Sequence, residues 1–217
     1  MRRFLIVVTG ILVISAMWMS LTVARIEGPP GNSGSVVRNI LYAHVPSSIC
    51  ALICFVVLLV ASIGYLANSK QSWDRVAQAS AEVGTVFATV LNLSGSIFSR
   101  AEWGPWWTAS PRLMSAAILW FLYVVYLILR SSLPGSIHRR ARVCAVFAII
   151  AFLDVPMVII SARFMPDIHK PSFSFTSSWQ SATFMLSMVA TVMLGAVLIW
   201  LRKDILKVKS KLEENLE

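Results

Sequence analysis

The stretch VPSSICALICFVVLLVASIGYLA, from Val45 to Ala67, runs for 23 residues without a charged side chain. A helix needs about 20 apolar residues to cross a hydrocarbon core of about 30 Å. Because lipid offers the backbone no hydrogen-bond partners, an apolar segment of this length must be helical. The stretch therefore predicts a membrane-spanning α-helix.

Five further stretches resemble it in length and composition, and only one of them contains a charged residue, Asp154. Hydrophobic residues make up 57% of the chain and charged residues 13%, and the mean hydropathy is +0.74. These values are typical of membrane proteins and exclude an ordinary soluble domain. We therefore expect an all-α fold in one membrane domain over residues 1–217. The six predicted spans are 4–24, 45–67, 83–99, 113–129, 143–162 and 181–201.

The first span follows Arg2 and Arg3, as the apolar part of a signal peptide would. Its apolar run is longer than the roughly 7–15 residues of a signal peptide, and the sequence around Ala24 and Arg25 is a poor cleavage site. We expect this span to be a retained helix.

The basic residues predict how the chain crosses the membrane. If the N-terminus is cytoplasmic, 13 of the 19 Lys and Arg residues fall on the cytoplasmic side, including those of a helical tail over 202–217. The positive-inside rule therefore places both termini on the cytoplasmic side. We expect the membrane to be the plasma (inner) membrane. The net charge of +9 indicates affinity for anionic lipid headgroups. Nucleic acid is not an expected partner, because the basic residues are not interleaved with stacking aromatics.

The predicted outer loop 100–112 contains Trp103-Gly104-Pro105-Trp106-Trp107. If this segment is helical, the spacing puts the three tryptophans on one face as an apolar platform. The simpler interpretation is an aromatic belt at the membrane boundary. Arg100 and Arg112 flank the run; they could pair with carboxylates of a ligand, or they could be ordinary boundary charges.

Two of the three histidines are expected on the same outer side. His44 precedes the second span, where Pro46 suits a first helical turn, and His169 lies between the fifth and sixth spans. His138 is expected in an inner loop, roughly 40 Å away across the bilayer. Two imidazoles beside indoles suit the two axial positions of a haem iron. Taken singly, each histidine is more often structural.

Other residues suggest little chemistry. Cys50, Cys54 and Cys144 form neither a Cys-x-x-Cys nor a Cys-x-x-Cys-His pattern, so covalent haem attachment is not expected. We expect these cysteines to be buried as small hydrophobic residues. Asp154, followed by Pro156, is costly in lipid and should face the bundle interior. It could serve a proton or substrate pathway, or simply a polar contact between helices. No Walker A motif is present.

Several segments resemble the haem exporter protein C (CcmC) family of cytochrome c maturation, in the class of tryptophan-rich haem-handling proteins. They are 42–46 (YAHVP), 94–98 (SGSIF) leading into 103–107 (WGPWW), 112–115 (RLMS) and 168–169 (IH). The resemblance covers most of the chain. In one departure, Ala109 and Ser110 stand where the family has a further Trp-Asp pair.

The resemblance implies that His44 and His169 are the axial ligands of a non-covalently held haem b at the outer face, against Trp103, Trp106 and Trp107. It implies a non-enzymatic role, in which haem is presented to a haem chaperone. The implied partners are the ATPase and membrane subunits of an ABC transporter and a small single-span protein. The alternatives are a membrane transporter subunit for haem or another solute, and a b-type electron-transfer cytochrome.

Overall fold

All regular elements in the described parts of the chain are helices. The computed structural model describes residues 2–26, 35–165 and 175–214. Within them, six segments are long and apolar enough to cross a membrane, which confirms the predicted all-α fold with six spans. The helices are α1 (Arg2–Thr22), α2 (Ser35–Arg38), α3 (Leu41–Asn68), α4 (Gln71–Trp103), α5 (Pro111–Ser132), α6 (Ile137–Ala151), α7 (Asp154–Phe164) and α8 (Ser178–Glu214).

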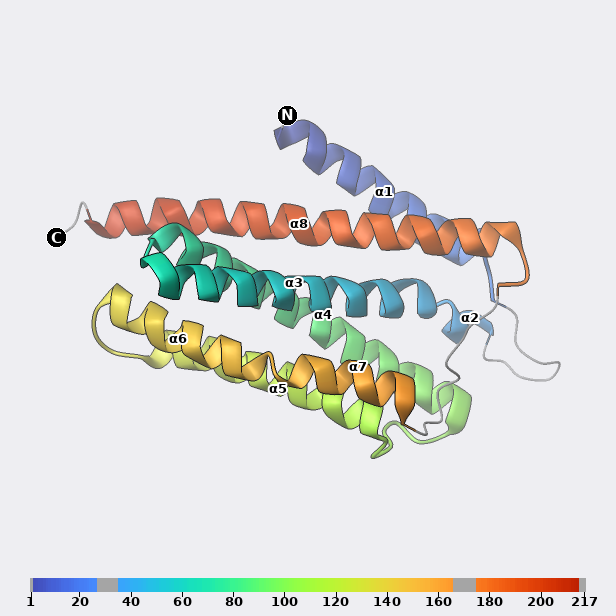
Figure 1. Cartoon of the computed structure of the whole chain (residues 1–217). Coiled ribbons are helices and arrows are strands. Elements are labelled where there is room, and N and C mark those ends of the chain that lie inside the picture. Colours follow the sequence, from blue (N-terminus) through green and yellow to red (C-terminus); the bar gives the residue numbers. More distant parts are fainter. Residues whose placement is uncertain (1, 27–34, 166–174, 215–217) are drawn as a thin grey trace.

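The hairpin of α3 and α4 forms the centre of the bundle (Figure 1). Helix α8 packs against both arms of the hairpin and carries α1 beside it, while α5, α6 and α7 cover the opposite side. The hairpin turns at Ser69, whose φ of 54° is left-handed and whose amide donates to the Tyr65 carbonyl at 2.7 Å. A left-handed residue of this kind is a common helix terminator.

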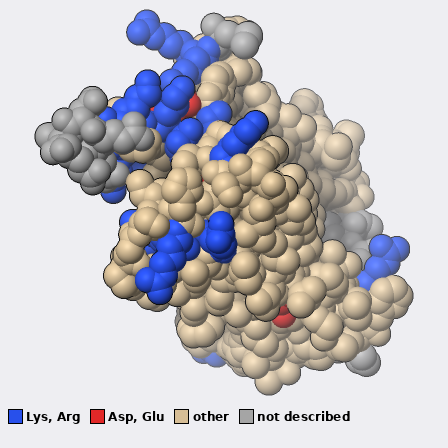
Figure 2. All heavy atoms as spheres, turned by 60° about the vertical axis from the view of Figure 1, so that its left-hand side comes forward, with Lys and Arg blue, Asp and Glu red and all other residues tan. Residues whose placement is uncertain are grey.

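The bundle has two ends, which we call the His44 end and the His138 end. His44 lies near the start of α3, whereas His138 lies in the first turn of α6, where its Nδ1 is 3.3 Å from the hydroxyl oxygen of Tyr65 near the end of α3. The two histidines therefore lie at opposite ends of α3, and His138 lies in a helix and not in the expected loop. Lys and Arg side chains gather at the His138 end, which Figure 2 turns toward the viewer.

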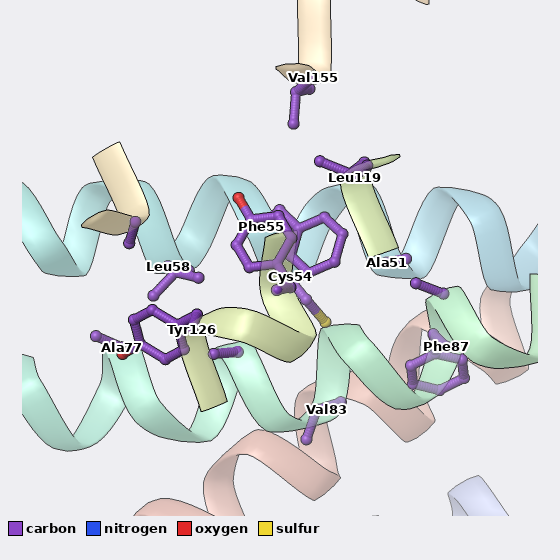
Figure 3. Packing of buried hydrophobic residues seen from close by; sticks show 14 of the residues in the cluster. Ala51, Cys54, Phe55, Leu58, Ala77, Val83, Phe87, Leu119, Tyr126 and Val155 are labelled. Atoms are coloured by element: carbon purple, nitrogen blue, oxygen red, sulfur yellow. The ribbon is translucent and has the colours of Figure 1, made fainter. Parts of the chain in front are cut away.

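The core consists of tightly packed aromatic, aliphatic and small side chains from the central helices (Figure 3). Phe55 of α3 stacks on Tyr123 of α5, with ring centroids 3.7 Å apart. Gly84 lets α4 approach α3 closely, because a Cβ there would lie 2.7 Å from the Phe55 ring. The three cysteines are buried and free, as the sequence indicated. This packing fixes α4 against α3, the two helices whose side chains meet at the candidate site described below.

Two of the predicted spans differ from the helices that contain them. The third span belongs to a helix that begins at Gln71, not near residue 83. Asp74 in its first turn is paired with Arg130 of α5. The fifth span is two helices, α6 and α7, which meet at Phe152 and Leu153. Pro156 lacks an amide hydrogen and its ring clashes with the carbonyl four residues earlier, so the helix breaks there.

The tryptophan run also differs from the expectation. Helix α4 continues to Trp103 and α5 begins at Pro111, so only residues 104–110 form the connection. Gly104 ends α4 with a φ of 95°, a conformation that favours glycine. Trp106 and Trp107 are therefore not on the α4 helix, and the condition for a shared helical face is not met.

Candidate functional site

His44 is the fourth residue of α3, in its first turn, at one end of the bundle. Its amide donates to the Ile40 carbonyl at 2.8 Å, a hydrogen bond that closes the first turn of the helix. Pro46 follows in the second turn, not in the first turn as the sequence suggested, and is accommodated inside the helix. The position of His44 at a helix start gives its ring access to the adjoining end of α4.

The imidazole of His44 packs against two neighbouring residues of α4. Its Nδ1 lies 2.9 Å from the hydroxyl oxygen of Ser94, a hydrogen bond between side chains 50 residues apart. A Cβ on Gly95 would lie 3.0 Å from Cε1 of the ring, so glycine supplies the space that the ring occupies. The ring is thus held on one edge by a polar contact and on another by close packing.

A small pocket opens beside this ring. Its volume is roughly 60 Å³, and its wall includes the side chains of His44, Trp107 and Arg112. The remaining lining residues are Leu91, Asn92, Gly95, Leu113 and Ala116. Pockets that enclose ligands of drug size are typically about 300–1,000 Å³. This pocket is therefore too small to enclose a ligand of that size.

The three tryptophans of the run have different surroundings. Trp107 is 38% exposed and lines the pocket with His44, whereas Trp106 is 59% exposed and lies outside the pocket lining. Trp103 packs edge-on against Phe98, with ring centroids 5.5 Å apart. Of the three indoles, Trp107 is therefore the one that the structure brings to the histidine.

The two flanking arginines also separate. Arg112, in the first turn of α5, lines the pocket. Arg100 is not part of the lining; its guanidinium donates to the Gly104 carbonyl and lies 6.0 Å from the ring centroid of Trp106. Arg100 thus satisfies a carbonyl at the end of α4, whereas Arg112 places a positive charge beside His44.

The second proposed ligand, His169, falls outside the described residues, as do its neighbours 166–174. The chain around this gap is described: α7 ends at Phe164 and α8 begins at Ser178. Both of these residues are at the His44 end of the bundle (Figure 1). The assignment of His169 remains a prediction from sequence.

A polar clamp fixes the start of α3 relative to α1. The Asn39 side chain donates to the Ser20 carbonyl at 2.8 Å and accepts from the Ile26 amide at 3.0 Å. The hydroxyl of Tyr42 donates to the Ala24 carbonyl at 2.8 Å. Buried side chains that satisfy backbone groups in this way stabilise one arrangement of the chain. The clamp therefore sets the position of the helix turn that carries His44.

Sequence reasoning missed the contacts of Ser94 and Asn92 with this site. Both are polar residues within an apolar span, which was an available signal. Which of them faces α3 depends on the rotation of α4 about its axis, and that rotation is set by the packing of the hairpin. A third missed contact joins Arg38 and Glu102, whose Nη2 and Oε1 lie 2.5 Å apart at the end of α4.

The fold and the site define a class of protein: a multi-pass α-helical membrane protein with histidine, tryptophan and arginine around a pocket at one end of the bundle. Comparison with known sequences narrows this class. A sequence model of the heme exporter protein C family matches residues 1–215. The chain belongs to this family.

Individual relatives support this assignment. The heme exporter protein C of Escherichia coli K12 is 27% identical over 167 residues, which cover 76% of this chain and 66% of the relative. The heme exporter protein C of Paracoccus denitrificans is 33% identical over 124 residues, which cover 56% of this chain and 51% of the relative. A Marchantia polymorpha protein named as a putative cytochrome c biosynthesis ccmC-like mitochondrial protein is 24% identical over 160 residues. These residues cover 72% of this chain and 64% of the relative. The chain spans about half to two thirds of the length of these relatives.

Proposed function

We propose that this protein is a membrane component of cytochrome c maturation that binds haem b non-covalently and presents it to a haem chaperone. The observation that carries the proposal is the meeting of His44, Trp107 and Arg112 around one pocket. An imidazole nitrogen ligates iron, an indole packs on the porphyrin, and a guanidinium pairs with a propionate. The family membership supports haem as the ligand.

In this proposal His44 and His169 would hold the haem iron through their imidazole nitrogens. Haem contributes the iron that both imidazoles bind, and the chain contributes their placement at one end of the bundle. Trp106 and Trp103 extend the apolar surface beside Trp107. No reaction is catalysed by the chain, whose role is to hold haem for transfer.

The membrane arrangement follows the sequence prediction. The protein lies in the plasma (inner) membrane with both termini on the cytoplasmic side. The His44 end therefore faces outward and meets the haem chaperone. The basic His138 end faces inward, where anionic lipid headgroups attract it. The partners are the ATPase and membrane subunits of an ABC transporter and a small single-span subunit. Together, residues 1–217 act as one membrane domain.

A visible absorption spectrum of the purified protein with haem tests this function. We expect a six-coordinate signal that His44→Ala and His169→Ala each weaken. His138→Ala is the matched control, because His138 lies at the opposite end beside Tyr65 and Gln71. If neither outer substitution changes the spectrum while haem remains bound, the ligand assignment is wrong.

Transport of haem or another solute is a second candidate with one supporting observation. Asp154 Oδ2, at the break between α6 and α7, is buried with no hydrogen-bond partner in the described residues. A carboxylate at membrane depth often lies on a substrate or proton path. Asp154→Asn should then slow movement of haem across vesicle membranes without altering the haem spectrum. If haem movement is unchanged, Asp154 has no role on such a path.

A further inference from the structure

We infer that Ser94 is a positioning residue that fixes the tautomer of His44, so that Nδ1 carries the hydrogen and Nε2 carries the lone pair that binds iron. This inference rests on the proposed function. A neutral imidazole has one donor nitrogen and one acceptor nitrogen, and the partner of one nitrogen determines the role of the other. Ser94 is the partner of Nδ1, at 2.9 Å.

The direction of this hydrogen bond follows from the other contacts of Ser94. A serine hydroxyl has one hydrogen to donate and two lone pairs to accept with. The hydroxyl oxygen lies 2.5 Å from the Val90 carbonyl and 3.2 Å from the Leu91 carbonyl, both in the preceding turn of α4. Carbonyl oxygens can only accept, so the single hydroxyl hydrogen goes to the helix backbone. The hydroxyl then accepts from Nδ1–H of His44.

The surroundings hold the ring in this orientation. Gly95 lies against Cε1, where any larger residue would displace the ring. Metal-binding histidines commonly donate their second ring nitrogen to an acceptor, which sets the tautomer and makes the ligand more basic. Loss of such an acceptor typically weakens metal binding by about 10- to 100-fold. Ser94 provides this acceptor from α4, which packs along α3.

The first test uses the haem-free protein in detergent, labelled with ¹⁵N-histidine, with the His44 signals assigned by their loss in His44→Ala. Nuclear magnetic resonance should show hydrogen on Nδ1 and none on Nε2 in the wild type. In Ser94→Ala, we expect a shift toward the Nε2–H tautomer that isolated histidine prefers. Ser94→Thr keeps the hydroxyl and should restore the wild-type pattern. Ser96→Ala, two positions along α4, is the matched control.

The second test measures haem in the same variants. Ser94→Ala should weaken haem binding by about 10-fold or more and should raise the reduction potential of bound haem, because His44 becomes a poorer electron donor. Ser94→Thr and Ser96→Ala should behave like the wild type. A merely structural serine would leave the tautomer and the potential unchanged.

The two proposals fail in different ways. If His44 carries its hydrogen on Nε2 in the wild type, or if Ser94→Ala changes neither the tautomer nor haem binding, Ser94 does not have this role. The proposed function would still stand if His44→Ala abolished the haem signal. If His44→Ala left that signal unchanged, the ligand assignment would fail, whereas the tautomer measured without haem would still report on Ser94.

Discussion

Gly95 shapes the candidate site because glycine has no Cβ. Its absent Cβ leaves the space that Cε1 of His44 occupies. Ser94 beside it contacts Nδ1 of the same ring, and Arg112 of α5 lines the adjoining pocket. Three residues from two helices thus define where the imidazole sits and what charge lies next to it.

Gly95→Ala should weaken haem binding while leaving the fold intact. The added Cβ would lie 3.0 Å from Cε1, so the His44 ring must shift. Alanine in a helix gains up to about 1 kcal/mol over glycine, which offsets part of the packing cost in the free energy of unfolding. Gly10→Ala in α1 is the control, because nothing lies within 4 Å of a Cβ there. Haem titration should show a loss only for Gly95→Ala, and equal affinities would contradict the packing argument.

Arg112→Gln should weaken haem binding by about 10- to 100-fold, since a hydrogen bond to a charged group contributes about 1.5–3 kcal/mol. Arg100→Gln should have a smaller effect, because Arg100 donates to the Gly104 carbonyl outside the pocket. Repeating the titration with haem dimethyl ester, which lacks propionate charges, isolates the interaction. If the ester shows the same loss in Arg112→Gln, then Arg112 does not act on a propionate.

At the scale of helices, ion pairs explain why α4 extends beyond its apolar stretch. Asp74 accepts from Arg130 of α5 at 2.9 and 2.6 Å, and Glu82 pairs with Arg202 of α8. A search for apolar residues detects the part of a helix that crosses lipid. It does not detect polar turns that continue the helix because a neighbouring helix supplies their partners.

The buried pair of Asp74 and Arg130 should contribute strongly to stability. Removing one partner of a buried ion pair typically costs about 3–5 kcal/mol, because the other charge is left buried. We expect Arg130→Met to lower the free energy of unfolding in detergent by this amount, and Asp74→Leu with Arg130→Met to recover most of it. Arg202→Met removes a more exposed charge and should cost about 1 kcal/mol or less. If Arg130→Met is neutral, the pair does not stabilise the fold.

The sequence predicted the number and order of the spans, because length and hydrophobicity decide them. It also predicted that His44 and Trp107 lie at the same end, since successive spans alternate direction. It could not predict that Trp106 and Trp103 lie outside the pocket lining. That outcome depends on Gly104, which ends α4 just after Trp103. The contact of Ser94 with His44 likewise depends on the rotation of α4, which no local pattern specifies.

At the scale of the whole molecule, the two ends of the bundle differ in chemistry. One end carries His44, Trp107 and Arg112, and at the other end Lys and Arg side chains gather on the surface (Figure 2). Arg2 of α1 pairs with Asp204 of α8 at 3.1 Å, which joins the first and last helices. The orientation of these ends across the membrane determines where haem would be offered.

Thiol labelling tests that orientation. Ala109→Cys and Ser132→Cys place single exposed cysteines at the His44 end and the His138 end, respectively. The native cysteines are buried, so they should react little. In intact cells with the outer surface of the membrane accessible, a membrane-impermeant reagent should label Ala109→Cys and should label Ser132→Cys only after permeabilisation. The reverse pattern would overturn the predicted topology.

The proposed function requires that His44 and His169 bind the same haem iron. Electron paramagnetic resonance of the ferric haem complex tests it most directly. We expect a single low-spin signal with two imidazole ligands. In both His44→Gly and His169→Gly this signal should convert to a high-spin signal, and added imidazole should restore it. A low-spin bis-imidazole signal that persists in either variant before imidazole is added would contradict the claim.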